Sequence, residues 1–290
     1  MNNKLININL IKEYFDGLKK HVFISTEFKK ILKEKHLEWN LSEDFKISKF
    51  INLLINEGKL TKYEFNFPVR KEIRYTWGLA TVYEIAISLK PHAYFSHYSA
   101  LFLHQLTEQI PNSIYVNAEQ KLASSGTKDL PQENIDRAFG NKPRTTNNIA
   151  TYQKHKIFLL NGMNTNNLGV IEYNGPEGKN LYVTDIERTL IDIVVRPYYS
   201  GGIFEILEAY KNASTILSIT KLIEYIKELN YTYPYHQAIG YYMQKSGTYS
   251  EDQISFIKEE FKIRNNFYLT YNMKEKVFIN DWKLFIPKGF

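Results

Sequence analysis

The sequence predicts an α+β fold, divided into a small domain over residues 1–90 and a larger domain over residues 91–290. Three observations support this prediction. Apolar residues at helical spacing dominate the start of the chain, a two-stranded hairpin pattern follows them, and the remainder mixes short strand patterns with helical ones. The length of 290 residues is roughly twice that of a common single domain, and a hydrophobic fraction of 43% is enough for packed cores.

Three helices are expected in the first domain. Apolar residues at positions 8, 11, 15 and 18 line one face of the first helix. The second helix is expected to begin at Ser25 or Thr26, since either side chain can cap it. The third helix has a complete apolar stripe at positions 47, 50, 51, 54 and 55, and it is expected to end at Gly58, because glycine tolerates the left-handed conformation found there.

A hairpin pattern comes directly after these helices, with strands at 59–67 and 72–77 around a turn at 68–71. Three helices followed by a two-stranded ribbon are the order of a winged helix-turn-helix, and a plain three-helix bundle is the alternative. A further helix at 79–89 is expected to lead to the domain boundary at Lys90 and Pro91.

The outward face of the third helix predicts contact with double-stranded DNA. It carries no acidic residue, whereas lysine suits phosphates and asparagine suits adenine edges in the major groove. Residues 1–90 also hold 16 lysines and arginines against 11 acidic residues, while the rest of the chain holds 21 against 20. The candidate DNA-binding residues are Lys46, Ser48, Lys49, Asn52 and Asn56 on the helix and Lys62, Arg70, Lys71 and Arg74 on the wing.

The second domain is expected to alternate strands and helices around one long polar loop. A helix capped by Ser96 or Ser99 leads to a strand at 113–118, and the loop at 119–148 holds a short helix near 133–139. Residues 184–187 have the form of a capping box that starts the next helix. The other expected strands are at 152–160, 168–173, 181–183, 267–271 and 277–286, and the other helices are at 203–210, 216–229, 234–244 and 251–263.

No catalytic residue, metal site or cofactor is predicted. Arg188 and Asp192 are spaced for an i, i+4 ion pair on a helix, and His97 and His104 lack the further ligands of a zinc site. Two glycines at 201–202 indicate a break between helices, because they lack the lysine and hydroxyl of a phosphate loop. The protein is therefore predicted not to be an enzyme. The alternative is a nucleic-acid-processing enzyme with an unrecognised site in the second domain.

A cytoplasmic location and no membrane association are expected. The sequence has no cysteine, so it can form no disulfide and no thiolate metal site. Its start lacks the order of a signal peptide, and no stretch approaches the roughly 18 apolar residues of a spanning helix.

Three segments of the second domain carry a resemblance to a known family. They read YFSHYSALFLHQLTEQIP at 94–111, VTDIERTLID at 183–192 and RPYYSGG at 196–202. Together with the winged-helix pattern before them, they resemble the AbiEi family of antitoxin regulators from type IV toxin–antitoxin and abortive-infection systems. Two features depart from the family's pattern: the long polar run at 119–148 and a lengthened turn at 36–42 before the third helix.

The resemblance implies a transcriptional repressor that controls its own operon. Family members bind inverted-repeat operators through the winged helix. They also counteract a nucleotidyltransferase-like toxin without forming a stable complex with it. The resemblance thus implies double-stranded DNA as a direct partner and such a toxin as a functional partner in phage defence.

Overall fold

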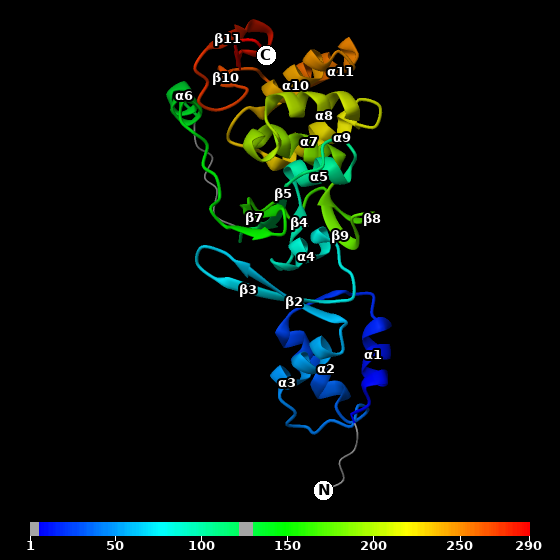
Figure 1. The fold of residues 1–290 in the computed structure, drawn as a ribbon. Helices are drawn as coiled ribbons and strands as arrows, with labels where there is room; N and C mark the ends of the chain where they lie inside the picture. The colour runs from blue at the N-terminus through cyan, green and yellow to red at the C-terminus, as the bar shows by residue number, and fades with distance from the viewer. Residues whose placement is uncertain (1–5, 122–129) are drawn as a thin grey trace.

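The structure is a computed structural model that describes residues 6–121 and 130–290. It confirms the predicted α+β class, with helices and mixed sheets in an elongated molecule (Figure 1). An N-terminal unit occupies one end, a six-stranded sheet lies in the middle, and a group of helices with a small sheet occupies the other end (Figure 1). The chain therefore runs broadly from one end of the molecule to the other.

The N-terminal unit has three helices and a three-stranded antiparallel sheet. The helices are α1 (Ile8–Asp16), α2 (Ser25–Lys35) and α3 (Ile47–Asn56). The strands, in the spatial order β1-β3-β2, are β1 (Val22–Phe23), β2 (Leu60–Asn66) and β3 (Lys71–Trp77). The three predicted helices and the hairpin are confirmed at these positions. The two-residue strand β1 was not predicted, because so short a strand has no periodicity.

Aromatic side chains form the core of this unit. Phe28 and Phe50 are fully buried, and Trp39 stacks on Phe50 with ring centroids 5.6 Å apart. Trp39 lies in the lengthened turn between α2 and α3, so this turn is anchored in the core. The expected cap of α2 is wrong, because neither Ser25 nor Thr26 caps the helix. Ile24 occupies the N-cap position, and its backbone amide donates to the Glu27 carboxylate at 2.9 Å.

The central sheet has six strands in the spatial order β6-β7-β5-β4-β9-β8. The pairs β7–β5 and β4–β9 are parallel, and the pairs β5–β4 and β9–β8 are antiparallel. Strand β6 pairs with β7 in the antiparallel sense at one edge of the sheet. The strand predicted at 152–160 is in fact part of a hairpin, because Gln153 adopts a φ of 51° and turns the chain. The strands are β4 (Tyr94–Phe95), β5 (Ser113–Glu119), β6 (Ile149–Tyr152), β7 (His155–Gly162), β8 (Val170–Gly175) and β9 (Gly178–Thr184).

The remaining elements confirm the predicted helices with small shifts of their ends. They are α4 (Val82–Ser88), α5 (His97–Leu103), α6 (Gln132–Gly140), α7 (Ile186–Val195), α8 (Ile203–Ala213), α9 (Ile219–Leu229), α10 (Tyr235–Ser246) and α11 (Glu251–Glu260). A small sheet near the C-terminus has the order β10-β12-β11, from β10 (Phe267–Tyr268), β11 (Lys276–Ile279) and β12 (Leu284–Pro287). Part of the predicted polar loop, residues 122–129, lies outside the described residues.

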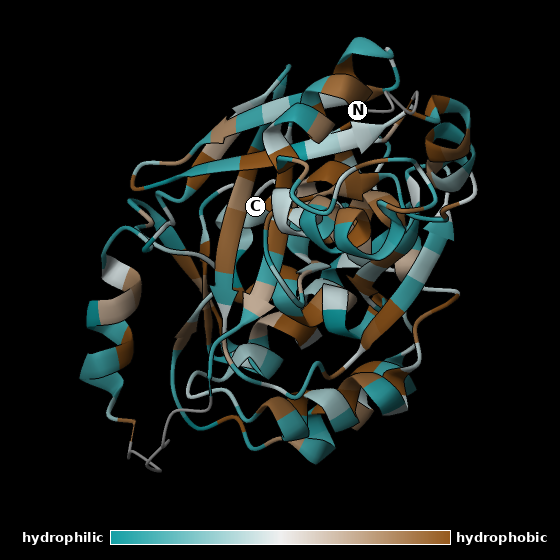
Figure 2. Ribbon diagram, turned by 90° about the horizontal axis from the view of Figure 1, so that it is seen from below, coloured by the Kyte–Doolittle hydropathy of each residue, from teal (hydrophilic) through white to brown (hydrophobic). Residues whose placement is uncertain are grey.

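Two buried hydrophobic clusters include residues of the central sheet. One joins sheet residues to α4 and to Phe65 and Phe67 of the N-terminal hairpin segment, and the other joins α5 and α7 to the helices that follow. Hydropathy colouring shows brown strands inside the molecule and helices with one brown and one teal side (Figure 2). Helix α4, placed by its sequence in the first domain, thus contributes its buried side chains to the core of the sheet.

Candidate functional site

The face of α3 that was expected to meet DNA is exposed. Phe50 and Leu54 have no solvent-accessible surface and anchor the opposite face of the helix. Among the described residues, neither Lys46 nor Lys49 forms an ion pair. The exposed residues are the five predicted from the apolar stripe: Lys46, Ser48, Lys49, Asn52 and Asn56.

Helix α2 adds cations that were missed from the sequence. Lys29, Lys30 and Lys33 are exposed, and none of them forms an ion pair within the part of the chain that the structure describes. Helix α2 packs against α3, so these lysines add to the exposed positive charge of the N-terminal unit. The signal for them in the sequence is the lysine-rich outward face of α2, at the positions that follow its buried residues Phe28 and Leu32. Exposed Glu43 and Asp44 precede α3 and limit the basic surface on that side.

The cations of the hairpin are partly neutralised by glutamates two positions further along the chain. Lys62 pairs with Glu64 at 2.6 Å, and Arg70 pairs with Glu72 at 2.8 Å. Lys71 is exposed and has no ion pair among the described residues. In Figure 1 the hairpin turn and α3 lie on the side of the molecule away from α1.

Arg74 is buried, so its predicted role as a DNA-binding residue is wrong. Its side chain is buried, with an exposed fraction of only 6%. Its Nε and Nη2 donate to the Ser88 carbonyl oxygen at 3.0 and 2.9 Å, and its Nη1 lies 3.1 Å from a Glu72 oxygen. Arg74 therefore joins β3 to the end of α4, and its donors are occupied.

The hairpin is also packed against the central sheet. The rings of Tyr63 and Phe65 lie 5.3 and 5.6 Å from the ring of Tyr152 in β6. This packing covers one face of the hairpin, and residues 74–77 of β3 are buried on both faces, so the exposed residues of the hairpin lie mainly in β2 and at its turn end. It also ties the N-terminal unit to the rest of the molecule.

Helix α7 carries the most polar of the family-like segments, and its cap differs from the prediction. The N-cap is Asp185, whose carboxylate accepts from the Arg188 amide at 2.9 Å, so the predicted capping box at Thr184 is wrong. Thr184 instead lies 2.8 Å from the hydroxyl of Thr189. Lys221 of α9 reaches Asp185 at 3.0 Å, so this cap also links two helices.

The predicted pair of Arg188 and Asp192 is confirmed and is buried. Arg188 Nε lies 2.9 Å from the Asp192 carboxylate, and the two side chains are 5% and 6% exposed. Arg188 also donates to the Leu168 carbonyl oxygen at 3.0 Å. Burial acts to lower the pKa of Arg188, but attraction by Asp192 outweighs it and the net shift of the pKa is upward. The pair is thus charged, and Arg188 is held by both a carboxylate and a carbonyl oxygen.

This ion pair lies at a cavity of about 330 Å³, which we call the Arg188 cavity. His97, at the start of α5, lines it with a φ of 56° and an exposed fraction of 8%. Burial lowers the pKa of His97 to about 4, so the imidazole is neutral near pH 7. The cavity is lined by His97, Asn117, Arg144, Thr145, Thr146, Leu160, Asn161, Gly162, Met163, Arg188, Asp192, Val195, Arg196, Tyr199 and Tyr231.

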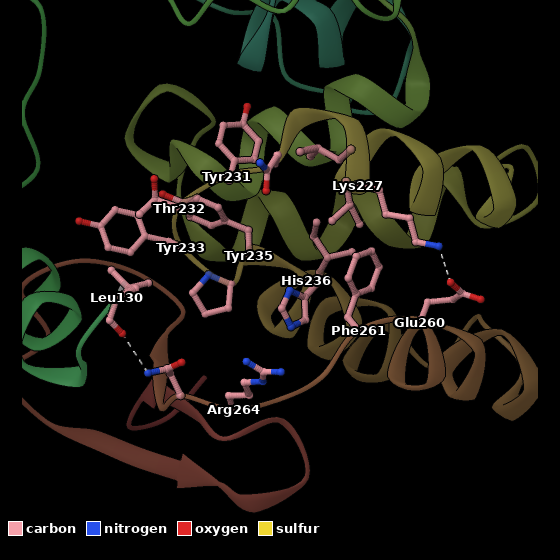
Figure 3. A pocket seen from close by; sticks show the side chains of 16 residues that line it. Leu130, Lys227, Tyr231, Thr232, Tyr233, Tyr235, His236, Glu260, Phe261 and Arg264 are labelled. Carbon is pink, nitrogen blue, oxygen red and sulfur yellow. Dashed lines mark hydrogen bonds and ion pairs between the residues drawn. The ribbon is translucent and has the colours of Figure 1, made fainter. Parts of the chain in front are cut away.

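A second cavity, of about 650 Å³, shares Tyr231 with the Arg188 cavity. Figure 3 shows tyrosine side chains along one side of it and His236 beside Phe261. The rings of His236 and Phe261 stack with centroids 4.9 Å apart, and an ion pair between Lys227 and Glu260 lies at one end (Figure 3). We call it the tyrosine cavity.

The described residues contain no group of three or more histidine, aspartate and glutamate side chains placed to hold a metal ion. Over the same part of the chain, no helix has the length and apolar character needed to span a bilayer.

Comparison with known proteins shows a relation in fold only. No family model matches the sequence, and no curated protein matches it. The fold is similar to the crystal structure of the RV2827C protein from Mycobacterium tuberculosis, with a TM-score of 0.58 and 12% sequence identity. The match covers 95% of this chain and 89% of that protein, so both parts of the molecule are included.

Proposed function

We propose that this protein is a DNA-binding transcriptional repressor in which α3 enters the major groove. The observation that carries the proposal is the exposed face of α3, where two lysines, a serine and two asparagines are free of acidic neighbours on the helix. Asparagine can bond both polar edge atoms of adenine, and lysine can bond phosphates or guanine. These residues are what a groove-reading helix requires.

The order of elements around α3 supports this proposal. The chain runs α1, β1, α2, α3, β2, β3, which is the order of a winged helix-turn-helix. In that arrangement α2 crosses the DNA backbone beside the reading helix. Lys29, Lys30 and Lys33 would then contact phosphates that flank the groove.

The hairpin has a smaller role in this proposal than its sequence implied. With Arg74 buried, the remaining wing cations are Lys62, Arg70 and Lys71, and two of these already have carboxylate partners. An arginine or lysine that is already paired gains less from a phosphate. Lys71 is therefore the main wing contact in the proposed complex.

We propose further that the second part of the chain acts as the antitoxin of a nucleotidyltransferase-like toxin. This step rests on the resemblance of residues 94–111, 183–192 and 196–202 to the AbiEi family. The proposal includes a cytoplasmic location, an inverted-repeat operator in the protein's own promoter, and neutralisation without a stable complex. Coexpression with the reading frame next to its gene tests it: this protein should restore growth, and a failure to do so at normal abundance would contradict it.

The DNA-binding proposal is tested with the full chain and two duplexes, the promoter of its own gene and a scrambled one. Fluorescence anisotropy across salt concentrations measures both affinities. Asn52→Ala should reduce the preference for the promoter by about 1–3 kcal/mol, as expected for one base contact. Lys30→Ala should weaken both complexes alike and reduce the salt slope by about 1.

The matched control is Lys211→Ala, which removes an exposed lysine on α8, far along the chain from α3. It should leave both affinities unchanged. The absence of salt-dependent binding, or equal behaviour of the α3 and control variants, would overturn the proposal.

A further inference from the structure

The lining of the Arg188 cavity has an excess of positive charge. Three arginines reach it from separate positions: Arg144 from the segment between α6 and β6, Arg188 from the first turn of α7, and Arg196 from the C-terminal cap of α7. Asp192 is the one carboxylate among the residues that line it. Three guanidinium groups against one carboxylate leave the lining with a net positive charge, which favours the binding of an anion.

Two of the three arginines are available to an anion. Arg188 is buried and bonded to Asp192, so this pair balances itself. Arg144 and Arg196 are exposed, and neither forms an ion pair among the described residues. A guanidinium group donates two parallel hydrogen bonds to a phosphate, and it stays charged at any physiological pH.

The rest of the lining suits an organic phosphate. The hydroxyl of Thr145 and the side-chain amide nitrogen of Asn161 add hydrogen-bonding groups beside the arginines, while the Thr146 hydroxyl already donates to the Leu159 carbonyl oxygen at 3.3 Å. The rings of Tyr199 and Tyr231 also line the cavity and offer flat apolar surfaces. A volume of about 330 Å³ lies at the small end of the range for ligand sites, which is compatible with a mononucleotide-sized molecule.

The backbone of His97 is an independent sign of a site. A buried histidine with a φ of 56° is uncommon, and strained residues of this kind gather at ligand sites. Its Nδ1 lies 2.7 Å from the Ser96 hydroxyl, which orients the ring at the cavity wall. The ring can therefore take part in hydrogen bonding to a ligand without adding charge.

The larger tyrosine cavity lacks this charge pattern. Its Lys227 is paired with Glu260, which leaves Arg264 as the unpaired cation among its lining residues (Figure 3). A single exposed arginine does not make a phosphate site, so Arg264 serves below as a matched control.

We infer that the Arg188 cavity binds a phosphate-bearing small molecule of about the size of a nucleoside monophosphate, with Arg144 and Arg196 holding the phosphate. The neighbouring tyrosines hold the organic part of the ligand. This site is separate from α3, so it does not depend on the proposed contact with DNA.

Isothermal titration of the full-length protein tests this inference with three probes: inorganic phosphate, adenosine 5′-monophosphate and adenosine. The monophosphate should bind, inorganic phosphate should compete with it, and adenosine should bind much more weakly. Arg144→Gln and Arg196→Gln should each weaken binding of the monophosphate by about tenfold or more, because each removes a charge-assisted contact. Thermal melting of each variant confirms that it is folded.

Two controls separate this site from other basic surfaces. Arg264→Gln and Lys211→Ala should bind the monophosphate as the wild type does. The inference is overturned if neither phosphate nor the monophosphate binds at millimolar concentration, if adenosine binds equally well, or if the two cavity variants behave like the controls.

Discussion

Replacement of His97 by asparagine is expected to make the fold less sensitive to acid. His97 is buried beside Tyr199, with ring centroids 5.6 Å apart, and burial lowers its pKa from 6.5 to about 4. Asp192 acts to raise this pKa, while Arg196 and Arg188 act to lower it. The folded protein therefore keeps His97 neutral over a range of pH in which the unfolded chain takes up a proton.

The sign of the effect follows from this difference. Well above pH 6.5 both states leave the imidazole neutral, so the contribution of His97 to stability is constant. As the pH falls from 6.5 towards 4, only the unfolded state is protonated, and the free energy of unfolding decreases. Between pH 7 and pH 5 the loss from this one histidine is about 2 kcal/mol.

The measurement is urea denaturation at pH 7, 6 and 5, followed by circular dichroism. Asparagine tolerates a positive φ, so His97→Asn keeps the backbone and removes the titrating group. Its free energy of unfolding should fall by about 2 kcal/mol less than that of the wild type over this range. His92→Asn is the matched control, because His92 has a similar φ of 51° but is exposed. Equal losses in wild type and His97→Asn would refute the reasoning.

Two further predictions concern packing and buried charge. Asp192→Asn should lower the free energy of unfolding by about 3–5 kcal/mol, because it leaves the buried Arg188 without its counter-charge. Glu275→Gln removes one partner of an exposed ion pair, whose side chains are 69% and 71% exposed, and should change the free energy of unfolding by less than about 1 kcal/mol. If urea denaturation gave the same loss for Asp192→Asn and Glu275→Gln, the burial of the Arg188–Asp192 pair would be contradicted. Gly240→Ala should lower the melting temperature, because a Cβ would lie 2.1 Å from the ring of Trp282, at a cost of about 1–3 kcal/mol. An unchanged melting temperature would refute the close packing.

Some features of this protein were determined by short stretches of sequence. The apolar stripe of α3 correctly placed its buried face around Phe50 and Leu54, because a helix repeats every 3.6 residues whatever it packs against. The pairing of Arg188 with Asp192 was predictable for the same reason, since residues four apart in a helix are neighbours. The exposure of Lys46, Lys49 and Asn52 followed as the complement of the buried stripe.

Tertiary structure alone decided the other features. A β-strand pattern says which residues share a face, but not which face another part of the chain will cover, so the burial of Arg74 against α4 could not be read from the hairpin. The same holds for the start of α7, where the choice of Asp185 as the cap goes together with its contact to Lys221 of α9.

The Arg188 cavity is the clearest case. Its lining brings together His97, Arg144 and Arg196, which are separated by long stretches of sequence and show no shared periodicity. Local sequence determined the charge and the helical setting of each residue. Only the folding of α5 and α7 together, with the segment before β6 beside them, placed the three side chains at one cavity, because contacts between distant segments depend on the packing of whole elements.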